Sequence, residues 1–217
     1  MIEIVREIEA AWREVGTGLL AGGEARVIRL GRTYDAPIED VWDAITNPER
    51  ITRWFLPISG DYRLGGRYQF EGNAGGTILA CEAPTRLRVT WEYGDPSAPP
   101  SEVEIRLARE GEGTALILEH VAIVPDEFWD QFGPGAVGVG WDGGLLGLTL
   151  QLRGGTVGDP IAWQLSDEGR AFFIRSSEAW GAASTAAGID PAAVETMVAN
   201  TTAFYAPPTP PEAGQPA

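Results

Sequence analysis

The spacing of apolar positions changes twice along the chain and divides it into a helical N-terminal arm, a β-rich middle and a helical C-terminal part. In residues 2–15, apolar side chains recur every three or four positions between charges, which predicts an amphipathic helix that packs on the body. A strand is expected over 25–34. Two short helices are expected over 37–46 and 48–55, because each segment begins with proline, which is favoured at the first helical position.

Residues 58–123 alternate apolar and polar side chains, and clusters of Gly, Asn and Pro interrupt the alternation. This pattern is typical of strands joined by turns, and it predicts an antiparallel meander of about six strands. The clearest strands are expected over 67–70, 77–81, 87–91, 103–107 and 115–121.

After Phe132 the apolar period becomes helical and predicts a long helix over 135–153. Its apolar residues fall on two opposite sides, one with Trp141, Leu145 and Leu148, the other with Val139, Leu146 and Leu150. A third strip consists of glycines, each of which weakens a helix by about 1 kcal/mol relative to alanine. Such a strip indicates close backbone approach or space left for a ligand. Helices expected over 167–187 and 191–205 would cover the second apolar side.

The composition excludes several kinds of chemistry. The 217 residues include one cysteine, Cys81, one histidine, His120, and no lysine. A single cysteine excludes an internal disulfide and a thiolate metal cluster, and without lysine neither a Schiff base nor a phosphate-binding P-loop can form. We therefore expect no metal and no cofactor.

The charge and hydropathy narrow the possible partners. The chain is acidic, with a formal net charge of -15, and negative charge repels phosphate groups and anionic lipid surfaces. Charged residues interrupt the first twenty positions, and no apolar run is long enough to span a membrane. We expect a cytoplasmic protein that binds neither nucleic acid nor membranes.

Several short motifs occur together in an order that resembles a known family. They are Tyr34-Asp35-Ala36-Pro37, Val41-Trp42-Asp43-Ala44-Ile45-Thr46-Asn47-Pro48, Trp54, Pro57, Gly65-Gly66-Arg67-Tyr68, Thr90-Trp91, and Gly113-Thr114 followed by Leu116, Leu118 and His120. Over about residues 25–153 the chain resembles the SRPBCC (START/Bet v1-like) superfamily, in particular the branch named after the activator of Hsp90 ATPase.

The resemblance implies an α+β helix-grip fold, in which a curved antiparallel sheet of about seven strands surrounds a long C-terminal helix and a central cavity. The sequence adds helices at both ends. We expect a helical arm over 1–22, the helix-grip domain over 23–154, a helical extension over 155–206 and a disordered, proline-rich tail over 207–217.

The inward faces implied by the resemblance give the candidate ligand-binding residues. They are Trp54, Tyr68, Phe70, Trp91, Leu116, Leu118, His120, Trp141, Leu145 and Leu148. These side chains offer a broad apolar and aromatic lining, which suits a small hydrophobic ligand.

His120 has two interpretations. It either meets a ligand, as hydrogen-bond partner or general base, or it is satisfied by neighbouring protein groups, and the second is the commoner state of a buried imidazole. A nucleophilic pair with Cys81 is not expected, because two intervening strands would separate the residues by roughly 14 Å. Glu119 should point to the opposite face from His120, so it offers no carboxylate partner.

We expect non-catalytic binding of a small hydrophobic or aromatic molecule, and no catalytic residue is assigned. Two alternatives stay open at this point. One is a cyclase-like or hydratase-like enzyme that uses His120 and Tyr68. The other is a partner-protein module like the chaperone activator that gives the branch its name, and a homodimer is also possible.

Overall fold

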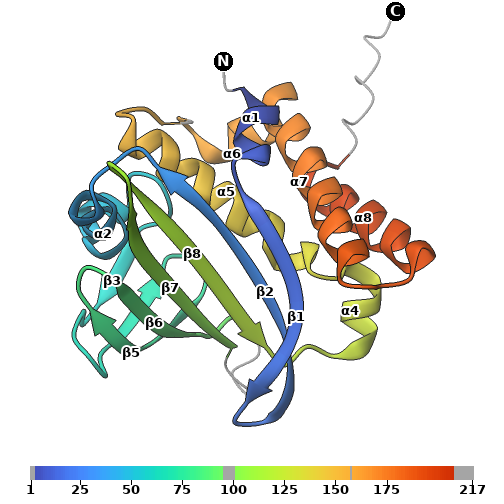
Figure 1. Cartoon of the computed structure of the whole chain (residues 1–217), viewed down its shortest axis with the longest axis horizontal. Coiled ribbons are helices and arrows are strands. Elements are labelled where there is room, and N and C mark those ends of the chain that lie inside the picture. The colour runs from blue at the N-terminus through green and yellow to red at the C-terminus, as the bar shows by residue number, and fades with distance from the viewer. Residues whose placement is uncertain (1–2, 95–100, 157, 208–217) are drawn as a thin grey trace, which may run out of the picture.

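The computed structural model describes residues 3–94, 101–156 and 158–207, and its central element is one curved antiparallel sheet of eight strands (Figure 1). In spatial order β1-β2-β8-β7-β6-β5-β4-β3, most strands pair with their sequence neighbours, as a meander requires. The strands are β1 Trp12–Leu20, β2 Gly23–Tyr34, β3 Ile58–Gly60, β4 Arg67–Phe70, β5 Gly75–Glu82, β6 Arg86–Trp91, β7 Ser101–Glu110 and β8 Gly113–Ala122.

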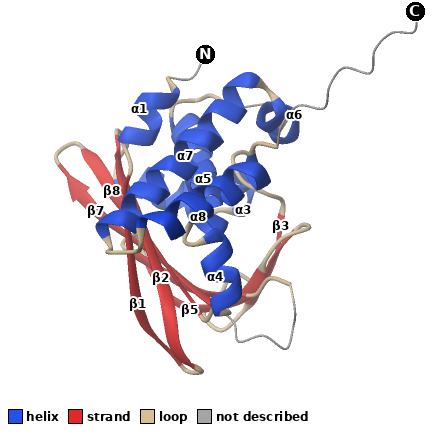
Figure 2. Cartoon of the chain, turned by 90° about the vertical axis from the view of Figure 1, so that its right-hand side faces the viewer, coloured by secondary structure: helices blue, strands red, loops and turns tan. Residues whose placement is uncertain are grey.

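The helices gather on one face of this sheet (Figure 2). They are α1 Ile4–Glu9, α2 Ile38–Thr46, α3 Pro48–Ile51, α4 Asp126–Phe132, α5 Gly135–Leu152, α6 Pro160–Leu165, α7 Asp167–Ala186 and α8 Pro191–Tyr205. The long helix α5 lies between the sheet and the pair α7 and α8, which confirms the predicted helix-grip architecture. The sequence pattern did not predict α4, α6 or β3.

Strand alternation forms inward rows of side chains across the sheet. Ile28, Val89, Val103 and His120 occupy paired positions in one row. Leu30, Leu87, Ile105 and Leu118 occupy the next row. Because strand residues alternate between faces, the residues between these rows point away from the helices.

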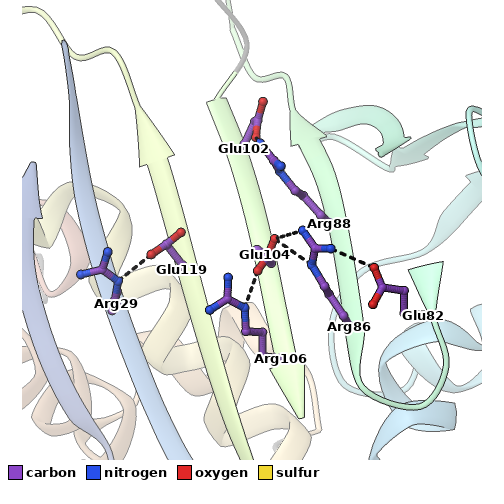
Figure 3. A network of polar contacts seen from close by, with 8 residues as sticks. All are labelled: Arg29, Glu82, Arg86, Arg88, Glu102, Glu104, Arg106 and Glu119. Atoms are coloured by element: carbon purple, nitrogen blue, oxygen red, sulfur yellow. Dashed lines mark hydrogen bonds and ion pairs between the residues drawn. The ribbon is translucent and has the colours of Figure 1, made fainter. Parts of the chain in front are cut away.

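The outer face carries a ladder of paired charges (Figure 3). Glu104 on β7 and Glu119 on β8 lie directly opposite each other, an arrangement that is unfavourable for like charges. Arg29 Nε lies 2.5 Å from the Glu119 carboxylate, and Arg86 and Arg106 both bind Glu104. Glu119 therefore faces outward, as predicted from its position beside His120.

The N-terminal arm corrects one prediction. The expected helix over 2–15 ends at Glu9, and Trp12 begins strand β1, which forms a hairpin with β2. Trp12 and Val15 are three positions apart, which fits a helical stripe, whereas in the strand they lie on opposite faces. Gly16 and Gly18 disfavour a helix. Pairing with β2 decides the outcome, and it raises the strand number from about seven to eight.

Helices α7 and α8 bury the side of α5 that faces away from the sheet. Val139 and Leu146 of α5 are fully buried, and Trp180 of α7 is 1% exposed. The α7 helix contacts α5 directly, so the cover comes from the same chain and requires no second copy. The tail expected to be disordered lies outside the described residues, apart from Pro207.

A buried polar cluster links helix α7 to helix α5 and strand β1. Asp142 of α5 forms a two-point ion pair with Arg13 of β1, at 3.0 and 2.9 Å. The same carboxylate accepts hydrogen bonds from Ser176 and Trp180 of α7, at 2.5 and 3.1 Å. One carboxylate therefore joins the N-terminal strand, the central helix and the C-terminal extension.

Candidate functional site

The helix grip encloses an apolar cavity of about 150 Å³ between the inner face of the sheet, α5 and the α2–α3 segment. Nine of the ten candidate residues line it, namely Trp54, Tyr68, Phe70, Trp91, Leu116, Leu118, Trp141, Leu145 and Leu148. An apolar cavity of about 150 Å³ can hold one benzene ring. Whether these side chains bind a ligand stays a prediction.

Aromatic rings form much of the wall. Phe70 lies in an edge-on contact with Phe55, with ring centroids 4.9 Å apart, and in a tilted contact with Trp91 at 5.7 Å. Trp91 in turn lies 4.8 Å from Trp141. Strands β4 and β6, helix α5 and the segment after α3 thus contribute to one continuous aromatic surface, because each directs a ring inward.

His120 is inward-facing and 5% exposed, but it does not line the cavity. Its Nδ1 accepts a hydrogen bond from Trp141 Nε1 at 3.1 Å, and its Nε2 lies 2.8 Å from Ser101 Oγ. An indole N–H can only donate, so the neutral imidazole carries its proton on Nε2 and donates to Ser101. Ser101 Oγ donates in turn to the Trp91 carbonyl at 2.8 Å.

Both ring nitrogens of His120 are therefore occupied by protein groups, which favours the second of its two interpretations. Burial lowers the pKa of His120 to about 4, so the ring is neutral near pH 7. Without a free nitrogen or a carboxylate beside it, this imidazole is poorly placed to act as a general base.

Two further polar groups of the lining are also engaged. The Tyr68 hydroxyl donates to the Thr90 carbonyl at 2.7 Å, and burial raises its pKa. Trp54 Nε1 donates to the Ala44 carbonyl at 2.9 Å. These contacts leave the aromatic faces of the two residues as their main contribution to the cavity.

Two lining residues reach the surface and mark the mouth of the cavity. Tyr62, in the loop between β3 and β4, is 43% exposed, and Cys81 near the end of β5 is also exposed. A shift of register in β5 between Ile78 and Ala80 turns Cys81 to the inner face. Strands β6 and β7 lie between Cys81 and His120, so the two cannot form a pair, as predicted.

Comparison with known proteins identifies the family. The family model "Activator of Hsp90 ATPase homolog 1-like protein" matches residues 35–148. The chain belongs to this family. The matched segment contains every residue that lines the cavity, from Ile45 to Leu148, and excludes β1 and helices α6 to α8.

Solved structures of other proteins are also similar to this chain. CalU16 from Micromonospora echinospora is 40% identical in its crystal structure, covering 80% of this chain and 98% of CalU16 with a TM-score of 0.64. Its solution structure gives 38% identity, 87% and 97% coverage and a TM-score of 0.66. Protein MLL2253 from Mesorhizobium loti is 25% identical over 59% of this chain and 97% of its own, with a TM-score of 0.52. Comparison with curated proteins gives no match.

Sequence reasoning missed part of the lining of this cavity. The missed residues include Phe55, Tyr62, Ile78, Cys81, Leu87, Val89, Val103, Ile105 and Gly144. Extending the alternation of Leu116 and Leu118 to β6 and β7 would have found the strand residues, because paired residues share a face. The register shift that turns Cys81 inward had no signal in the sequence.

The described residues contain neither a cluster of metal ligands nor a membrane-spanning helix. Among them, no three His, Cys, Asp or Glu side chains come together where they could hold a metal ion. No helix in the described ranges is long and apolar enough to cross a membrane.

Proposed function

We propose that this chain binds a small apolar or aromatic molecule in the cavity and does not transform it. The cavity itself carries the proposal, because about 150 Å³ of space lies among aromatic and aliphatic side chains inside an otherwise packed core. Apolar cavities of this size gain favourable contacts when a matching molecule fills them.

The groups beside the cavity support binding over catalysis. His120 has a protein partner at each ring nitrogen, and the Tyr68 hydroxyl donates to a main-chain carbonyl. A proton-transfer mechanism would need one of these groups free to reach the ligand. For this reason the cyclase-like and hydratase-like alternatives are not favoured, and no observation on the described residues favours the partner-protein alternative.

Gly144 offers a sharp test, because it lines the cavity and an added Cβ would meet only Phe55, at 3.9 Å. Gly143→Ala is the matched control, since its methyl group would meet Phe173 at 3.7 Å on the other side of α5. Ethylbenzene is titrated against both variants and the wild type by two-dimensional NMR. We expect Gly144→Ala to weaken binding about tenfold, since overfilling costs about 1–3 kcal/mol, and Gly143→Ala to leave it unchanged.

Equal affinity in all three proteins, or no binding to the wild type, contradicts the proposal. Incubation followed by mass spectrometry tests the second part of it. A chemically altered ligand whose formation disappears in His120→Gln would replace binding with catalysis.

A further inference from the structure

The indole of Trp141 forms a wall of the cavity, and its own helix holds it only in part. Of the four residues one turn away on α5, Val137 and Leu145 carry side chains, whereas Gly138 and Gly144 do not. Side chains three and four positions apart normally restrict each other on a helix surface, and glycine offers no such restraint. The orientation of this ring therefore depends in part on contacts from the sheet.

The sheet supplies those contacts through three residues on separate strands. Trp141 Nε1 donates to His120 of β8, His120 Nε2 donates to Ser101 of β7, and Ser101 donates to the main chain of Trp91 on β6. Trp91 also contacts the Trp141 ring, with centroids 4.8 Å apart. The hydrogen-bonded chain thus joins both tryptophans of this part of the cavity.

Space for an alternative position of the indole exists in the cavity that the ring already lines. A Cβ built on Gly144 has Phe55 as its nearest neighbour outside α5, at 3.9 Å, and Gly144 lines the cavity. An unrestrained Trp141 ring could therefore turn into the cavity and occupy the space that a ligand needs. Filling the cavity with the chain's own indole would compete with binding because packing contacts favour an occupied cavity.

We propose that His120, supported by Ser101, is a positioning residue for ligand binding: it holds the Trp141 indole as a wall of the cavity and keeps it from filling the cavity. This inference rests on the proposed function. His120 acts through Trp141, since it does not itself line the cavity.

The test measures ethylbenzene affinity at pH 7 in the full chain. His120→Leu removes the acceptor for Trp141, and we expect about tenfold weaker binding, typical of losing one buried hydrogen bond. His120→Gln is the matched control, because its amide oxygen and nitrogen can replace both ring nitrogens, so we expect affinity within about twofold of the wild type.

A double-mutant cycle separates positioning from a general loss of structure. Trp141→Phe has no indole N–H, so adding His120→Leu to it should weaken binding no further. Losses that add, or a His120→Leu protein that binds as well as the wild type, would overturn the inference.

A spectroscopic measurement keeps this inference separate from the proposed function. The single histidine should show the tautomer protonated at Nε2 in ¹⁵N NMR, and the Trp141 indole proton should shift upfield in His120→Leu, as expected on loss of its acceptor. If the wild type binds no ethylbenzene, the proposed function fails while these signals still test the hydrogen-bonded chain. If it binds and the tautomer is protonated at Nδ1, the positioning role fails alone.

Discussion

Helix α5 carries glycines both on the side that packs against α7 and on the side that faces the cavity, and their surroundings differ. Toward α7 the helix is tightly packed, and a Cβ on Gly138 would lie 2.3 Å from the Trp180 ring. Beside the cavity, a Cβ on Gly144 would meet only Phe55, at the ordinary contact distance of 3.9 Å. At these two positions, glycine therefore permits close contact beside α7 and leaves volume beside the cavity.

The buried polar groups of the two sides differ in the same way. Asp142 on the packed side joins three elements through an ion pair and hydrogen bonds. His120 on the cavity side is neutral and fixes one ring. The comparison teaches that the C-terminal extension stabilises the helix, while the sheet shapes the space beside it.

Removing helices α6 to α8, which cover α5, should have the largest effect on solubility and stability. A chain that ends at Gly155 would expose Val139 and Leu146, which are fully buried in the intact protein. An apolar strip of this kind binds other apolar surfaces, so we expect aggregation or strong binding of a hydrophobic dye. Light scattering and dye fluorescence provide the measurement. A truncated protein with the solubility and melting temperature of the full chain would show that the cover is dispensable.

Asp142→Ala should have the next largest effect. It leaves the Arg13 guanidinium buried without its carboxylate, and breaking a buried ion pair in this way costs about 3–5 kcal/mol. Urea denaturation measures the loss of unfolding free energy. Exposed ion pairs contribute far less to stability. Arg6→Ala, which breaks the surface pair with Glu3, is therefore the control, and we expect it to change the unfolding free energy by less than about 1 kcal/mol.

The neutral state of His120 predicts a pH dependence of stability. The pKa of His120 is about 4 in the folded protein against 6.5 for the free side chain, so between these values the unfolded chain binds a proton that the folded chain does not. Stability should therefore fall as the pH drops from 6.5 to 4, by roughly 3 kcal/mol in total, and change no further through this group below pH 4.

Denaturation of wild type and His120→Gln across this range isolates the contribution of His120, because all the carboxylates are common to both proteins. The wild type should lose roughly 3 kcal/mol of stability relative to His120→Gln as the pH falls from 6.5 to 4. Parallel curves would mean that the imidazole is protonated in the folded state near its usual pKa.

Alanine at single glycines should give the smallest effects, with opposite signs on the two sides of α5. Gly138→Ala forces the methyl group into Trp180 and should cost about 1–3 kcal/mol of unfolding free energy. Gly144→Ala meets no close neighbour and should add up to about 1 kcal/mol through helix propensity. Thermal denaturation distinguishes the two, and a shared sign would remove the proposed difference between the two sides.

Local pattern was sufficient for much of the fold and part of the site. The predicted strand over 67–70 and helices over 135–153, 167–187 and 191–205 agree with the observed elements within a few residues, because a long run with one period favours one backbone conformation. The same alternation and the family resemblance led to Leu116, Leu118 and Trp91, which line the cavity.

Tertiary structure decided what the period left ambiguous. The apolar spacing in residues 12–15 favours a helix, and only pairing with β2 makes them a strand. The glycine strip indicated either close backbone approach or space for a ligand. The neighbour Trp180 makes Gly138 a position of close approach, and the more distant Phe55 leaves space beside Gly144. In each case the deciding contact comes from residues distant in sequence.

By itself, then, the sequence determined the periods, the turns and the absence of lysine, disulfide and thiolate-cluster chemistry, because these depend only on composition and on neighbours along the chain. The partners of His120 depend on how β6, β7, β8 and α5 meet. A hydrogen bond needs two groups within about 3 Å, and only the folded arrangement brings residues 101, 120 and 141 that close.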